Sequence, residues 1–264
     1  MGELDGVRIG VTAERRADDL ISALLRYGAQ VRHAPTITIV PLAEDPELRL
    51  STEAVLAAPV AFTAVTTGAG FRGWLAAADG WGLKADLLTA LGASRIFARG
   101  PKAVGAVRGA GLREEFSAPG ESNAELFGEL VSAGVVGSRV AVQLHGAPLP
   151  EFTGLLVGAE VVAVQPYRWH SPADTAPVVS LAHDILAAEV EALVFTSAPA
   201  ATNFLTLTAG TGAHDVLRRG AIKTFCVGPV TAAPLEAQGI PTVQPDRQRL
   251  GALVKLVVST LGRA

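Results

Sequence analysis

Short β-branched apolar runs alternate with longer stretches of helical periodicity along the whole chain. This alternation is typical of parallel sheets whose strands are joined by crossover helices. The stretch 17–27 places Leu20, Leu24 and Tyr27 on one helical face and ends at Gly28, a natural helix terminator. The pattern therefore predicts an α/β fold with ten strands: Val7–Thr12, Gln30–Ala34, Val60–Val65, Arg95–Ala98, Arg113–Ser117, Arg139–Leu144, Glu160–Gln165, Ala192–Thr196, Lys223–Val227 and Ile240–Val243.

The chain repeats its own pattern about 130 residues apart. Three segments recur: Arg95–Pro101 as Lys223–Pro229 with an offset of 128, Ala61–Thr63 as Val194–Thr196 with an offset of 133, and Val7–Val11 as Ser138–Val142 with an offset of 131. The repeat predicts two copies of one α/β unit. We expect them to face each other across a cleft and the functional groups to line that cleft.

Tandem domains and interleaved domains both fit this repeat. The first and second blocks of each copy are separated by proline-containing stretches, 35–46 and 166–177, whereas only Gly134–Gly137 separates the two copies. Crossings between domains favour long linkers, so the interleaved arrangement is preferred. It predicts two flavodoxin-like domains of five parallel strands: a discontinuous domain at 1–37 and 171–264, and a continuous domain at 44–164. Residues 38–43 and 165–170 would be inter-domain linker strands that run side by side.

The bulk composition excludes several classes of protein. A formal net charge of −3 argues against a nucleic-acid surface, and no apolar run is long enough to span a membrane. Residues 1–5 lack the form of a signal peptide, so a soluble, cytoplasmic protein is expected. The single cysteine, Cys226, lies in a strand-like apolar run and is interpreted as a buried structural thiol.

Two segments in the C-terminal half carry a family resemblance. Phe195–Ala198 follows a strand, and Phe225–Ala232, with Gly-Pro at its centre, leads into a helix. This order resembles the C-terminal signature of uroporphyrinogen-III synthases. Tyr27–Val31 after the first helix and Pro166–Arg168 at the second crossing are also similar to that family, so the resemblance extends over nearly the whole chain.

The resemblance implies a cyclising lyase of tetrapyrrole (haem) biosynthesis. Such an enzyme converts hydroxymethylbilane into uroporphyrinogen III plus water while inverting ring D. It implies a monomer with no cofactor or metal, and hydroxymethylbilane synthase as the candidate supplier of the substrate. Five scattered histidines and one cysteine likewise provide no metal cluster and no Ser-His-Asp set.

Two departures keep an alternative open. The family commonly has Thr-Arg-Pro after the first strand, where this chain has Thr12-Ala13-Glu14, and Trp169-His170 stand where small residues are common. The alternative function is a non-catalytic, synthase-like module that binds a ligand or acts as a regulatory sensor.

Binding a substrate rich in carboxylates calls for helix N-termini and cations at the carboxyl ends of strands. Tyr167 at the crossing is predicted to assist catalysis, with packing in the linker as the alternative. Gly-Pro turns and Thr231 can also simply begin helices, and each cation can be a solvated surface residue. The predicted substrate-binding residues are Arg15, Arg16, Thr66, Thr67, Gly68, Arg99, Gly100, Lys102, Ser122, Asn123, His145, Arg168, Thr196, Ser197, Ala198, Gly228, Pro229 and Thr231.

A glycine motif at 68–73 imitates a dinucleotide fingerprint. Gly68, Gly70 and Gly73 form Gly-x-Gly-x-x-Gly between a predicted strand and a helix. A dinucleotide fold also places an acidic residue at the end of the next strand, where this chain has Arg99. Nucleotide binding is therefore disfavoured.

Overall fold

The computed structural model describes residues 2–262, and within them the chain forms two compact units. One unit holds the chain up to Thr38 and from His170 onward, and the other holds Ile39–Trp169. Each is built on a parallel sheet, so the fold class is the predicted one.

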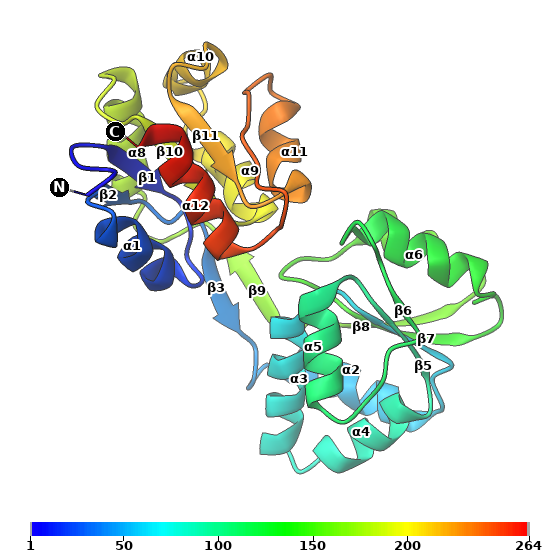
Figure 1. The fold of residues 1–264 in the computed structure, drawn as a ribbon. Helices are drawn as coiled ribbons and strands as arrows, with labels where there is room; N and C mark the ends of the chain where they lie inside the picture. Colours follow the sequence, from blue (N-terminus) through cyan, green and yellow to red (C-terminus); the bar gives the residue numbers. More distant parts are fainter. Residues whose placement is uncertain (1, 263–264) are drawn as a thin grey trace. The chain divides into compact units, whose positions relative to one another are not determined.

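The contiguous unit has a five-stranded sheet in the order β6-β5-β4-β7-β8, with every neighbouring pair parallel. Its strands are β4 Phe62–Val65, β5 Arg95–Ala98, β6 Phe116–Ser117, β7 Arg139–Gln143 and β8 Glu160–Val164. Its helices are α2 Pro46–Ala57, α3 Gly68–Gly80, α4 Lys84–Gly92, α5 Pro101–Gly109, α6 Asn123–Ser132 and α7 Pro150–Thr153. Helices α2 to α5 cover one face of the sheet, and α6 and α7 pack on the other (Figure 1).

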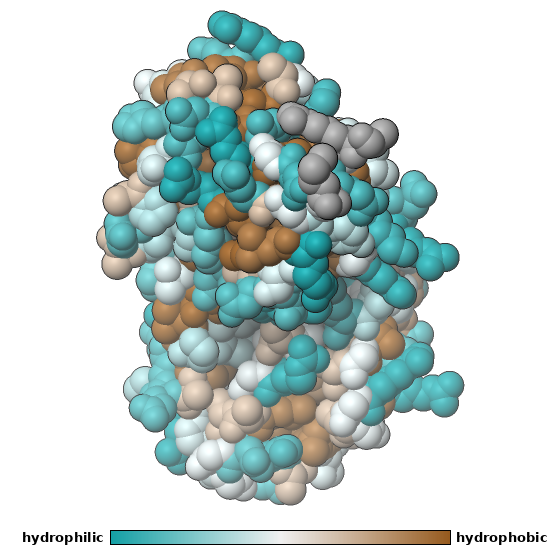
Figure 2. Space-filling view, turned by 60° about the vertical axis from the view of Figure 1, so that its left-hand side comes forward, coloured by the Kyte–Doolittle hydropathy of each residue, from teal (hydrophilic) through white to brown (hydrophobic). Residues whose placement is uncertain are grey.

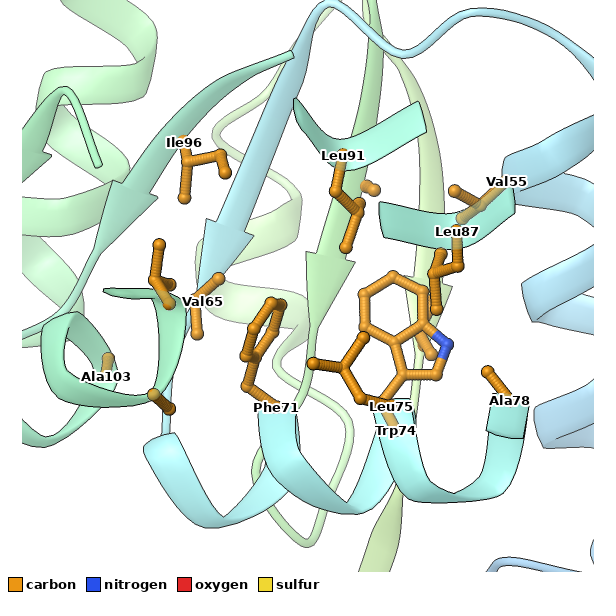
Figure 3. Packing of buried hydrophobic residues seen from close by; sticks show 14 of the residues in the cluster. Val55, Val65, Phe71, Trp74, Leu75, Ala78, Leu87, Leu91, Ile96 and Ala103 are labelled. Carbon is orange, nitrogen blue, oxygen red and sulfur yellow. The ribbon is translucent and has the colours of Figure 1, made fainter. Parts of the chain in front are cut away.

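Alternation along the strands separates the core of this unit into two layers. On β4, Val65 belongs to the cluster under α2 to α5, while Phe62 and Ala64 belong to the cluster under α6. Trp74 of α3 is fully buried at the centre of the first cluster (Figure 3). Its indole N–H donates to the hydroxyl of Thr52 at 2.9 Å, which satisfies the one polar atom of the ring.

The discontinuous unit has the sheet order β11-β10-β1-β2, again parallel. Its strands are β1 Arg8–Val11, β2 Gln30–His33, β10 Ala192–Phe195 and β11 Lys223–Cys226. Its helices are α1 Ala17–Arg26, α8 Ala176–Leu186, α9 Ala198–Leu207, α10 Ala213–Arg218, α11 Pro229–Glu236 and α12 Leu250–Leu261. One core cluster joins the sheet to α8 to α11, and another joins it to α1 and α12.

The prediction of five strands in each unit is wrong for this discontinuous one. The segment predicted as a strand at 240–243 makes only an isolated bridge between Val243 and Phe225. Pro241 has no N–H to donate to a ladder, so the segment cannot pair regularly. The predicted strand 113–117 is also shortened to Phe116–Ser117, which pairs with Phe97 and Ala98 of β5. The side chains of Glu114 and Glu115 before it form ion pairs with Arg108 and Arg95.

The two sheets share one spatial order although the chain enters them differently. Strands β7 and β8 occupy the places of β1 and β2, and β4 and β5 occupy those of β10 and β11. The hydrogen-bonded register places Phe62 of β4 opposite Arg95 and Ala192 of β10 opposite Lys223. The equivalence is therefore Phe62 with Ala192, an offset of 130. The predicted offset of 133 is wrong, because Phe62 and Thr63 begin β4 whereas Phe195 ends β10 and Thr196 follows it.

The two crossing segments pair with each other as β3 (Thr38–Pro41) and β9 (Tyr167–His170), the two-stranded ladder that the linkers predict. Just beyond the ladder, Leu42 N–H donates to the carbonyl of Pro166 at 3.0 Å. Arg168 on β9 forms an ion pair with Glu47 at 2.8 Å. These contacts hold both crossing segments together at the border of the contiguous unit.

Apolar residues on the face drawn in Figure 2 lie in separate patches among polar ones. Of the helices described, none is both long and apolar enough to cross a bilayer. Cys226 is fully buried on β11, and burial, reinforced by Glu236, raises the pKa of its thiol to about 12. The interpretation of Cys226 as a structural thiol is confirmed, because a thiol that stays protonated is a poor nucleophile.

Candidate functional site

Polar groups gather at the carboxyl edge of the contiguous sheet. Adjacent parallel strands β5, β4 and β7 end there, so the residues that follow them share one edge. The predicted residues of this edge are Thr66, Thr67, Gly68, Arg99, Gly100, Lys102, Ser122, Asn123 and His145. Tyr167 of β9 contacts the same edge, because its hydroxyl lies 3.5 Å from that of Thr67.

The glycine motif owes two of its glycines to close packing. A Cβ on Gly68 would lie 2.0 Å from the backbone oxygen of Lys102, so the start of α3 must approach α5 without a side chain. A Cβ on Gly70 would lie 2.2 Å from the side-chain nitrogen of Gln143. Gly73 has no such constraint, its nearest neighbour being Pro166 at 3.9 Å. Packing thus accounts for Gly68 and Gly70 without a nucleotide.

A buried glutamine that the sequence analysis missed organises this edge. Gln143, the last residue of β7, is fully buried, and its side-chain oxygen accepts the backbone N–H of Thr67 at 3.1 Å. The backbone carbonyl of Gln143 accepts the hydroxyl of Thr66 at 2.7 Å. Its side-chain nitrogen donates to the carbonyl of Leu144 and, at 3.4 Å, to the hydroxyl of Thr67. A polar residue closing the apolar run 140–142 is the signal that could have identified it.

Tyr167 is held against the edge by a glycine that leaves room for two aromatic rings. Gly146 has a φ of +76°, a backbone conformation that favours glycine. A Cβ there would lie 2.1 Å from the Trp169 ring and 3.1 Å from the Tyr167 ring. The backbone N–H of Trp169 also donates to the Gly146 carbonyl at 3.2 Å. Trp169 thus helps to fix β9 and its tyrosine.

Arg99 is a partly buried cation that forms no ion pair with the described residues. No hydrogen bond or ion pair of its guanidinium is found among residues 2–262. Burial lowers the pKa of Arg99, and electrostatic interactions with Tyr167 and Glu121 act in the opposite direction. A desolvated guanidinium that makes no ion pair is suited to a carboxylate ligand.

His145 lies close enough to Arg99 to feel its charge. Burial chiefly, and Arg99 in addition, lower the pKa of His145 to about 4. The imidazole is therefore neutral near pH 7. Its Nδ1 is buried without a hydrogen-bond partner in the described part of the chain, and so is Oδ1 of Asn123. Two buried polar atoms at one edge thus have hydrogen-bonding capacity that the described residues do not use.

We expect His145 to make the protein sensitive to acid. Between pH 6.5 and about 4 the unfolded chain binds a proton at this histidine and the folded chain does not. The free energy of unfolding therefore falls as the pH falls through this window, by at most about 3 kcal/mol. Urea unfolding at pH 7 and pH 4.5 should show a smaller loss for His145→Asn than for the native protein. Equal losses would contradict this assignment.

The remaining predicted residues of this unit have local partners. Ser122 caps α6 in a capping box with Glu125. Arg168 is paired with Glu47 and lies 3.8 Å from Asp45. A Cβ on Gly100 would lie 2.9 Å from the side chain of Glu121, so the loop after β6 covers this turn closely.

The discontinuous unit has its own polar edge. Ser197 caps α9 by accepting the Ala200 N–H at 3.4 Å, as Thr67 caps α3 by accepting the Gly70 N–H at 3.1 Å. Gly228 is the N-cap of α11, and a Cβ there would lie within 2.7 Å of Gln248. The other predicted residues at this edge are Thr196, Ala198, Pro229 and the buried Thr231.

The cations at the two edges differ in burial. The equivalents of Arg99 and Lys102 in the discontinuous unit are Val227 and Val230, by the offset of 128 that the strand register supports. Arg15 and Arg16 follow β1 but are exposed, and Arg16 is paired with Asp19 at 2.7 Å. The partly buried positive charge therefore belongs to the contiguous unit.

No group of three or more His, Cys, Asp or Glu side chains that could hold a metal ion occurs in the part of the chain that the structure describes. The chemistry of the edge comes from an arginine, a neutral histidine, hydroxyl and amide groups, and a phenol.

Fold and edges together define a class: α/β proteins whose two parallel-sheet units are interleaved along the chain. The chain belongs to the uroporphyrinogen-III synthase family, because the family model HEM4, described as uroporphyrinogen-III synthase HemD, matches residues 18–255. The Bacillus subtilis (strain 168) protein "Uncharacterized protein YjjA" is 28% identical over 259 residues, 94% of each chain.

Solved structures of the same family have the same fold. A mutant uroporphyrinogen III synthase of the extremely thermophilic bacterium Thermus thermophilus is 26% identical, with a TM-score of 0.81 over 97% of this chain and 99% of that one. The uroporphyrinogen-III synthetase of Helicobacter pylori 26695 is 14% identical with a TM-score of 0.53, covering 96% and 99% of the two chains. At that identity the likeness concerns the fold alone.

Proposed function

We propose that this protein is a uroporphyrinogen-III synthase, which converts hydroxymethylbilane into uroporphyrinogen III and water with inversion of ring D. The observation that carries the proposal is the family match over residues 18–255, on a chain whose polar edge combines Arg99 with Tyr167. The substrate bears carboxylates on every ring, and the guanidinium of Arg99 is the cation best placed to bind one of them.

In the proposed reaction the terminal hydroxyl of the bilane leaves first, with a proton, as water. The substituted carbon of ring D then attacks the resulting azafulvene cation and forms a spiro intermediate. Fragmentation and recombination invert ring D and close the macrocycle. The bilane cyclises without a catalyst to the unrearranged isomer, so the protein's main contribution is to hold the chain in the geometry that leads to inversion.

The proposed roles follow from the groups at the edge. The Tyr167 hydroxyl donates a proton to the departing hydroxyl, and Arg99 pairs with a carboxylate nearby. His145, neutral at pH 7, offers its buried Nδ1 to the substrate without adding charge. We further propose that the enzyme acts as a cytoplasmic monomer and receives its unstable substrate from hydroxymethylbilane synthase.

The test couples the purified protein to hydroxymethylbilane synthase and separates the oxidised porphyrins by chromatography. We expect the type III isomer to dominate, whereas heat-denatured protein gives type I from spontaneous closure. Type I alone with the folded protein would contradict the proposal and favour the non-catalytic sensor.

A further inference from the structure

The side-chain amide of Gln143 can take only one orientation at the polar edge. The Thr67 backbone N–H is a donor, so the atom of Gln143 that lies 3.1 Å from it must be the oxygen. The amide nitrogen then faces the carbonyl of Leu144 and the hydroxyl oxygen of Thr67. Because Gln143 is fully buried, no water competes for these positions.

This orientation determines where the Thr67 hydroxyl proton points. The hydroxyl oxygen accepts two hydrogen bonds, from the Gly70 N–H at 3.1 Å and from the Gln143 amide at 3.4 Å. A hydroxyl has two lone pairs and one proton, so both lone pairs are occupied. The proton is left for the remaining neighbour, the hydroxyl oxygen of Tyr167 at 3.5 Å.

From this network we infer that Gln143 is a positioning residue for Tyr167, acting through Thr67. Tyr167 then receives a hydrogen bond from Thr67. Among residues 2–262 its hydroxyl has no other hydrogen-bond partner, so its own proton can point to the substrate. The inference rests on the proposed function. With its proton directed away from Thr67, Tyr167 can donate to the departing hydroxyl of the substrate.

The discontinuous unit supports this assignment, because it keeps the hydroxyl cap at Ser197 but lacks both the glutamine and the glycine. The residue equivalent to Gln143 is Thr12, whose hydroxyl donates to the Val194 carbonyl at 3.1 Å. The residue equivalent to Gly70 is Ala200, by the offset of 130. A side chain at position 70 would collide with Gln143, whereas the short Thr12 leaves room for an alanine. Glutamine and glycine thus occur together, in the unit that holds the tyrosine.

The test uses Gln143→Met, which keeps the shape but removes both hydrogen-bonding groups, and Gln143→Glu, whose carboxyl has at most one proton and cannot donate to both Leu144 and Thr67. In both variants Thr67 loses the hydrogen bond that it accepts from Gln143, so the direction of its hydroxyl proton toward Tyr167 is no longer fixed. We expect kcat to fall about tenfold with KM nearly unchanged. Exposed Gln30→Leu on β2 is the matched control and should keep native kinetics.

A spectroscopic readout separates positioning from packing. The chain has two tyrosines, so Tyr27→Phe leaves Tyr167 as the single source of a ¹³Cζ-tyrosine NMR signal. Both Gln143 variants should move this signal, and Gln30→Leu should not. A native kcat and an unmoved signal in Gln143→Met would overturn the inference. If the Gln143 variants do not fold, Thr67→Ala tests the same link, and an unmoved signal there overturns it too.

The two proposals fail in distinguishable ways. A native protein that forms no type III isomer contradicts the function, while the NMR signal still tests the link between Gln143 and Tyr167. If the native protein forms the type III isomer but the Gln143 variants keep its kcat and its Tyr167 signal, only the inference is contradicted.

Discussion

Replacing Tyr167 by phenylalanine is expected to lower kcat about 100-fold while the fold and KM change little. The ring remains packed beside Gly146, so only the hydroxyl is lost. A positioned proton donor contributes roughly 10²–10⁴-fold, and the lower end suits a substrate that reacts without help. The rate of type III formation measures this loss, in an assay that is quenched at set times and in which hydroxymethylbilane synthase supplies the bilane.

The control for this experiment is the other tyrosine. Tyr27→Phe changes a partly buried ring after α1 in the discontinuous unit and should keep native turnover. Native turnover in Tyr167→Phe would reduce this tyrosine to a packing role on β9. An equal loss in both variants would point to a general effect of removing a phenol.

Replacing Trp74 by alanine is expected to destabilise the contiguous unit by about 3–5 kcal/mol. The indole is fully buried, meets Phe71 edge-on with ring centroids 6.4 Å apart, and donates to Thr52. Alanine would leave a large cavity where the ring now packs among Leu75, Leu87 and their neighbours; Figure 3 shows this native packing. Urea unfolding followed by circular dichroism measures the loss, as a transition of this unit that moves to lower urea.

The matched control is Trp81→Ala, a partly buried tryptophan that follows α3. It should cost clearly less, because part of its ring is already in water. A loss below about 1 kcal/mol for Trp74→Ala would mean that the core collapses around the missing ring. Two folding units can unfold separately, so each transition is fitted by itself.

Much of the fold follows from local sequence patterns, because buried parallel strands are short apolar runs and the helices between them are amphipathic. Strands such as 192–195 and 223–226 lie inside their predicted ranges. The predicted strand at 240–243 does not form, because Pro241 has no N–H to donate to β11. The segment keeps only the isolated bridge between Val243 and Phe225. The Phe-Thr pairs at 62–63 and 195–196 are identical in sequence but lie at different positions in the strand register, so sequence identity predicts the wrong offset there.

The polar edge was predictable only in part. Arg99, His145 and Thr67 could be identified because they directly follow predicted strands, where ligand-binding groups of parallel sheets lie. Gln143 lies inside β7, and its side-chain amide forms hydrogen bonds with Thr67, which follows the neighbouring strand β4. Such a partnership depends on which strands are neighbours, and a single sequence does not state that.

The interleaved chain has a consequence for synthesis on the ribosome. Strand β1 pairs with β10, whose first residue comes more than 180 positions later, whereas β4 finds all its partners between residues 95 and 143. At roughly 5–20 residues per second, β1 waits about 10–40 s for its neighbour. The contiguous unit can fold in that interval, while β1, α1 and β2 keep an unfinished apolar face in water. Chaperones that protect nascent chains are thus expected to meet this protein first at its N-terminal βαβ segment.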